Sequence, residues 1–167
     1  MKKFFGVAIA MLLLATVTFA GPAAKHKATG DADWVNNPSN YNQQANTTFN
    51  AINTGATGLE AKGSLIYTDA NVTYTMDIQL LKVVGDEASF AGVVTSVNTN
   101  EAGCCLVGNW IIYKVRDIGE PGVGADQIWG ADLGPNSSED ARAKVTSMFE
   151  PEGGGPFVLN GGNIQVH

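Results

Sequence analysis

The sequence has few of the residues from which catalytic and zinc sites are usually built. Among 167 residues there are only two histidines, His26 and His167, and two cysteines, Cys104 and Cys105. Histidine-dependent hydrolysis needs a histidine held beside a nucleophile, whereas these two lie near the start of the exported segment and at the carboxyl terminus. Zinc is also disfavoured, because adjacent cysteines rarely share one ion. We therefore expect no enzymatic activity.

The spacing of the cysteines also excludes an ordinary disulfide framework. Cys104 and Cys105 are neighbours, so a bond between them would close no long loop. Three states remain open: two reduced and buried side chains, a vicinal disulfide in a loop, and pairing between molecules. Gly103 and Gly108 flank the pair and allow an unusual turn.

Positive charge is scarce. The chain has 10 lysines and arginines against 16 aspartates and glutamates, which gives a formal net charge of -6. Two of the lysines, Lys2 and Lys3, belong to an amino-terminal segment that we expect to be removed. An acidic surface repels nucleic acid phosphates and anionic lipid head groups. The expected partner is an unidentified extracellular protein or small ligand, and the oligomeric state stays open.

The amino-terminal segment has the pattern of a secretory signal peptide. Lys2 and Lys3 precede an apolar run over residues 4–19, and Thr18-Phe19-Ala20 resembles a peptidase cleavage site. We expect residues 1–20 to be cleaved near Ala20 and the protein to be secreted or periplasmic. No later stretch has the roughly 20 apolar residues of a membrane-spanning helix.

Most of the remaining chain alternates between apolar and polar residues, which is typical of strands. The clearest case is residues 72–80, where Val72, Tyr74, Met76, Ile78 and Leu80 are expected on one face. Residues 21–46 are interpreted as a linker and amino-terminal segment that packs back as a cap or first strand. Residues 47–167 are predicted to form an all-β domain, a single antiparallel meander of about 7 to 8 strands closing into a small barrel or a sandwich.

One segment departs from the strand pattern. Residues 141–149 carry Ala141, Val145 and Met148 at helical spacing, preceded by Ser137 and Ser138 as candidate N-caps. We predict one short helix, inserted before the last strand.

Two groups of side chains are candidates for ligand binding. Four aromatic residues could line the mouth of a barrel, with ordinary packing in the core as the alternative: Trp110, Trp129, Tyr67 and Tyr113. Trp110 shares its strand face with Lys114 and Arg116, which suggests an outward or cavity-facing position.

The second group consists of the carboxylates Asp117, Glu120 and Asp126 in a turn rich in glycine and proline. Calcium takes six to eight oxygen ligands, and such a turn could supply several. The alternative is that these carboxylates accept hydrogen bonds from the amides of the turn and fix its shape.

Three segments together resemble a known type of domain. They are residues 115–126 (Val-Arg-Asp-Ile-Gly-Glu-Pro-Gly-Val-Gly-Ala-Asp), residues 161–167 (Gly-Gly-Asn-Ile-Gln-Val-His) and residues 83–92. The chain from about residue 48 to 167 resembles the secreted β-domain found after choice-of-anchor modules in bacterial and archaeal surface proteins. This resemblance implies a small barrel-like fold outside the cytoplasm, and it transfers no activity. The segment over residues 135–156 is longer than in that pattern, and the cysteine pair is not part of it.

These features favour a secreted, non-enzymatic β-domain that acts as an interaction or accessory module in the cell envelope or outside the cell. The alternative is binding of a small ligand or carbohydrate in a barrel mouth. A hydrolase would need two carboxylates facing each other across a cleft, and the spacing of the sequence selects no such pair.

Overall fold

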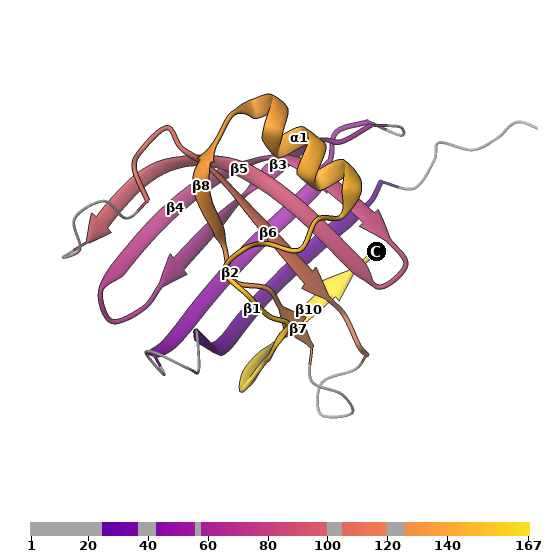
Figure 1. The fold of residues 1–167 in the computed structure, drawn as a ribbon. Coiled ribbons are helices and arrows are strands. Elements are labelled where there is room, and N and C mark those ends of the chain that lie inside the picture. The colour runs from indigo at the N-terminus through magenta and orange to yellow at the C-terminus, as the bar shows by residue number, and fades with distance from the viewer. Residues whose placement is uncertain (1–24, 37–42, 56–57, 100–104, 120–125) are drawn as a thin grey trace, which may run out of the picture.

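The computed structural model describes residues 25–36, 43–55, 58–99, 105–119 and 126–167. In these residues the chain forms one strongly curled antiparallel sheet and one helix, α1 (Figure 1), which confirms the all-β class and the single inserted helix. The elements in chain order are β1 (Lys27–Asn36), β2 (Gln43–Asn53), β3 (Glu60–Thr68), β4 (Val72–Val84), β5 (Glu87–Thr99), β6 (Trp110–Arg116), β7 (Gln127–Ile128), β8 (Asp132–Asn136), α1 (Ser138–Ser147), β9 (Phe157–Val158) and β10 (Gly161–Val166).

The sheet is a meander through its first seven strands. The order is β10-β1-β2-β3-β4-β5-β6-β7-β9, with β8 paired to β6 beside this path. β1 lies within residues 21–46, the segment interpreted as a linker followed by a cap or first strand, and it pairs with β2 along its whole length. The sheet therefore begins at Lys27, about twenty residues before the start of the strand pattern recognised in the sequence.

The last segment of the chain joins the two ends of the sheet. β9 pairs with β7, and β10, which follows after two residues, pairs with β1. Lys27 and His167 exchange two backbone hydrogen bonds of 2.8 Å each. The sheet is thus curled into a half-barrel whose first and last strands are neighbours.

Aromatic side chains fill the inner face of the curled sheet. Seven of them form a continuous series in which each contacts the next. Five of these contacts are between rings, with centroids separated by 5.0 to 6.3 Å, and the sixth is between two hydroxyl groups. That contact is a short hydrogen bond between Tyr74 and Tyr113. The series runs Phe157, Trp34, Tyr67, Tyr74, Tyr113, Phe90 and Phe49. Small residues make room for it: a side chain at Gly30 would lie 2.5 Å from the ring of Phe49.

A second, smaller apolar cluster lies on the outer face of the sheet, where α1 crosses β4, β5 and β6 (Figure 1). Ala141 and Val145 of the helix pack on side chains of these strands, and the predicted N-cap, Ser137, accepts a hydrogen bond from the amide of Asp140. The helix therefore covers an apolar part of the outer face: Leu80, Ala91 and Ile112.

The prediction that Leu80 shares a face with Ile78 is wrong. A bulge at Gln79 inserts one extra residue into β4, so that Ile78 lies opposite Gly92 while Leu80 lies opposite Ala91. Because one extra residue exchanges the two faces, Leu80 turns outward to α1 and Leu81 joins the inner core.

Candidate functional site

A hollow among the described residues lies on the outer face, at the amino-terminal end of α1. Its volume is about 390 Å³, within the range of small-molecule sites. Strands β3, β4 and β6 form its floor and α1 forms one wall. The lining side chains are Glu60, Gln79, Leu80, Trp110, Ser138, Glu139 and Arg142; we call this hollow the α1 pocket.

The floor of the pocket depends on irregular strand pairing. Glu60 of β3 lies opposite Leu80, and the register shifts between Glu60 and Gly63 as well as at Gln79. Bulges re-aim side chains and are common beside binding sites. Here the bulge brings Gln79 and Leu80 to the pocket from a strand whose regular alternation would have turned Leu80 inward.

Trp110 supplies the aromatic surface of the pocket. It is the first residue of β6 and is only partly buried, packed against the outer cluster. The sequence pattern placed it on the face opposite Ile111 and Tyr113, and the structure confirms this, since both of those residues belong to the inner core.

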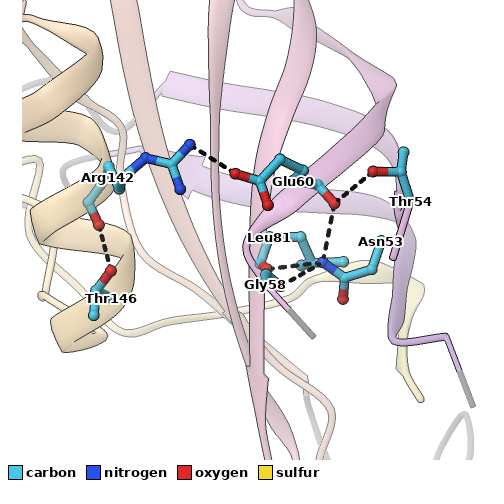
Figure 2. Close-up of polar contacts among 7 residues, drawn as sticks. All are labelled: Asn53, Thr54, Gly58, Glu60, Leu81, Arg142 and Thr146. Atoms are coloured by element: carbon cyan, nitrogen blue, oxygen red, sulfur yellow. Dashed lines mark hydrogen bonds and ion pairs between the residues drawn. The ribbon is translucent and has the colours of Figure 1, made fainter. Parts of the chain in front are cut away.

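An ion pair spans the edge of the pocket. One guanidinium nitrogen of Arg142 lies 2.9 Å from Oε1 of Glu60 (Figure 2). The side chains stay 49% and 61% exposed, so water screens the pair and it adds little to stability. The pKa of Glu60 is lowered, first by a hydrogen bond to its own backbone amide and then by Arg142, so the carboxylate is ionised at neutral pH.

The backbone beneath this ion pair is held in place by side-chain hydrogen bonds. The side-chain amide of Asn53, which is 2% exposed, donates to the carbonyls of Glu60 at 3.4 Å and Leu81 at 3.1 Å (Figure 2). The hydroxyl of Thr54 donates to the same carbonyl of Glu60 at 3.2 Å. Glu60 is thereby fixed relative to both neighbouring strands.

The helix wall is also anchored at the end farther from the pocket. Lys144 contacts the carboxylate of Asp132 at 2.7 Å, and Lys82 of β4 donates to the carbonyl of Thr146. Both sides of the pocket are therefore attached to the sheet.

Of the four predicted aromatic ligand residues, only Trp110 lines this pocket. Tyr67 and Tyr113 belong to the ring series of the inner face. Trp129 is 3% exposed, and the ammonium group of Lys114 lies 4.7 Å from the centre of its ring. The structure does not bring the four residues together, because strand alternation and burial separate them.

The two described carboxylates of the predicted calcium turn accept backbone hydrogen bonds. Asp126 accepts from the amides of Ile118 at 3.0 Å and Ile164 at 2.7 Å. Asp117 accepts from Gly119 at 3.0 Å and Val166 at 3.1 Å. Glu120 lies outside the described residues, and within them no group of three or more acidic, histidine or cysteine side chains could hold a metal ion.

These carboxylates form a seam between β10 and the β6–β7 region. The amide of His167 faces β1, so in the alternating antiparallel pattern the amides of Ile164 and Val166 face away from β1. They would lack partners in the sheet, and Asp126 and Asp117 satisfy them. Asp117 and Asp126, two of the three residues proposed as calcium ligands, thus hold the last strand in place.

The cysteine pair is only half described. Cys105 is buried and has a φ of 46°, in the left-handed region that residues other than glycine rarely adopt, while Cys104 lies outside the described residues. The three alternatives for the pair therefore involve a residue outside the described part of the chain.

Sequence reasoning missed Glu60, Gln79, Leu80 and Arg142. Glu60 and Arg142 are 82 residues apart, and no local pattern connects them. The available signal was weaker: an outward-facing tryptophan beside the only segment of helical spacing.

Comparisons of the chain with models of known protein families, with curated proteins and with solved structures gave no match. The resemblance to the domain that follows choice-of-anchor modules therefore stays a prediction. In the described part of the chain, no helix is both long and apolar enough to cross a membrane.

Proposed function

We propose that this protein is an exported, non-catalytic module that acts by binding, in the cell envelope or outside the cell, and that the α1 pocket is its binding surface. The observation that carries the proposal is the pocket itself. A partly buried indole and an exposed ion pair lie together at a hollow whose two sides are fastened to the sheet.

A binding role suits the chemistry of the lining better than catalysis does. Neither histidine nor cysteine lines the pocket, and the Glu60 carboxylate is paired with Arg142. The pKa of Glu60 is lowered, whereas a general acid needs a raised pKa. The side chains present can make contacts and orient a ligand.

The binding site is proposed on the outer face because the inner face is already filled. Tyr67 and Tyr113, expected at a barrel mouth, are 5% and 0% exposed and pack against neighbouring rings. A ligand inside the curled sheet would have to displace this core.

Binding is tested with a library of small fragments of mixed chemistry, including charged, apolar and polyhydroxylated compounds, by ligand-observed NMR on the exported chain. We expect hits whose signals are lost with the Trp110→Ala variant. Hits unaffected by this variant, or no hits, would reject the pocket as the binding surface.

Export is tested separately by expressing the full chain in a bacterial host and measuring the intact mass of the protein released from the periplasm or medium. The expected mass is that of a chain beginning at Gly21. Accumulation of the full-length chain in the cytoplasm would contradict the assignment of the signal peptide.

A further inference from the structure

We infer that the α1 pocket binds a neutral, hydroxyl-rich ring, the chemistry of a carbohydrate. This inference rests on the proposed binding function and names its ligand class. It follows from three properties of the lining: its apolar surface, its mixture of donors and acceptors, and the presence of charges of both signs.

The apolar surface of the pocket is the indole of Trp110 on its floor, which packs against the outer cluster that contains the buried Leu80. The face of an indole ring carries partial negative charge, and the C–H groups on one side of a sugar ring carry partial positive charge. A flat ring with an apolar side can therefore stack there, whereas a fully polar ligand would leave the indole without a partner.

The polar wall offers hydrogen-bond donors and acceptors side by side. The hydrogen bond from Arg142 to Glu60 uses one of the five N–H donors of the guanidinium group and one lone pair of the carboxylate. Both groups can form further hydrogen bonds. Gln79 adds an amide that both donates and accepts. Hydroxyl groups also donate and accept, so neighbouring hydroxyls on a ring can satisfy both kinds of group.

Charges of both signs lie close together in the lining. Glu60 is paired with Arg142, so neither group is left to bind an ion alone, and Glu139 adds a charge that repels an anion. Trp110 is the single aromatic ring in the lining, so the cage of several rings that holds quaternary ammonium groups is not formed. A neutral ligand does not meet this repulsion.

The experiment uses cellobiose, N,N′-diacetylchitobiose and methyl α-mannopyranoside as neutral probes, with tetramethylammonium and acetate as charged ones. Binding to the exported chain is measured by calorimetry and by NMR shifts. We expect saturable binding of at least one neutral probe, weakened about tenfold or more by Trp110→Ala and measurably by Arg142→Gln.

The matched control is Arg116→Gln. Arg116 forms an ion pair of 2.8 Å with Asp86, with side chains 43% and 49% exposed, away from the pocket. The Arg116→Gln variant loses the same kind of ion pair as Arg142→Gln does, and it should bind the sugar as tightly as the unchanged protein. Because Trp110 also packs under the helix, Trp110→Phe is included, and circular dichroism verifies that each variant is folded.

The outcomes separate the two proposals. If charged or apolar fragments bind at the pocket and the sugars do not, the ligand class is wrong and the binding function stands. If sugars bind equally well to the Trp110→Ala and Arg142→Gln variants, the site is wrong. If nothing binds at the pocket, both proposals fail.

Discussion

Asp132 is a carboxylate that is 2% exposed, beneath the wall of the pocket. Such a group needs a compensating charge, and Lys144 supplies it at 2.7 Å. The pKa of Lys144 is raised, first by its hydrogen bond to Asp132. This pair fixes the carboxyl-terminal half of α1 to the strand that precedes the helix.

Removing the lysine alone should be costly. In Lys144→Met the carboxylate of Asp132 stays buried without its cation, and we expect the free energy of unfolding at pH 7 to fall by about 3 kcal/mol. Urea unfolding measures the change. The double variant Asp132→Asn with Lys144→Met should recover most of the loss, because no buried charge remains; a double variant no more stable than the single one would contradict this account.

Burial also explains why one of the four candidate aromatic residues lies in the pocket and the other three do not. The sequence offers four aromatic residues as candidates for ligand binding: Trp110, Tyr67, Tyr113 and Trp129. The period of two in residues 110–116 correctly separated Trp110 from Tyr113. This alternation could not predict how much of each face is buried, because burial of the outer face depends on where α1 packs.

Among the elements, β10 has the most unusual attachment. One edge of this strand pairs with β1, and the other is held by two side chains. A carboxylate that accepts amide hydrogen bonds forms a stronger contact than a neutral acceptor does. Asp126 forms two such hydrogen bonds, with the amides of Ile118 and Ile164.

Asp126→Asn should loosen this strand. The substitution removes the charge and turns one acceptor into a donor, so we expect a loss of about 2 kcal/mol in the free energy of unfolding. Amide hydrogen exchange should accelerate at Ile164. Asp86→Asn, which changes an exposed carboxylate paired with Arg116, is the control and should leave this exchange unchanged. Unaltered exchange at Ile164 in the Asp126 variant would argue against the seam.

The elements also show how far a sequence pattern reaches. The turns around Asp69 and Gly85, the strands on either side of them and the capped helix follow from local chemistry, and the structure confirms them. The bulge at Gln79 does not follow from local chemistry, because the pairing of β4 with β5 determines which residue stays unpaired. The α1 pocket depends on that bulge and therefore could not be predicted from the sequence.

At the scale of the whole molecule, the filled interior gives a characteristic response to alkali. The pKa of Tyr74 is raised well above 10.0, chiefly by burial and then by Tyr113, and the pKa of Lys144 is raised from 10.5. The folded protein thus holds these protons more tightly than the unfolded chain does. Their contribution to stability is complete below about pH 10 and is lost as the pH rises further.

Tyr74→Phe tests the contribution of the core. Between pH 10 and 12 the free energy of unfolding should fall less steeply in this variant, by up to about 1.4 kcal/mol per pH unit, the equivalent of one proton. Urea unfolding at several pH values measures the slope. Equal slopes in the two proteins would mean that Tyr74 ionises as easily in the fold as outside it.

The position of the last strand beside the first has a practical consequence. Lys27 and His167 are hydrogen-bonded partners, so a short linker could connect residue 167 to residue 27 without distorting either strand. New chain ends could then be opened in the exposed turn at Gly85 and Asp86, which joins β4 to β5. Such a circular permutant would keep every strand pairing and the α1 pocket, while the order in which the strands are synthesised would change.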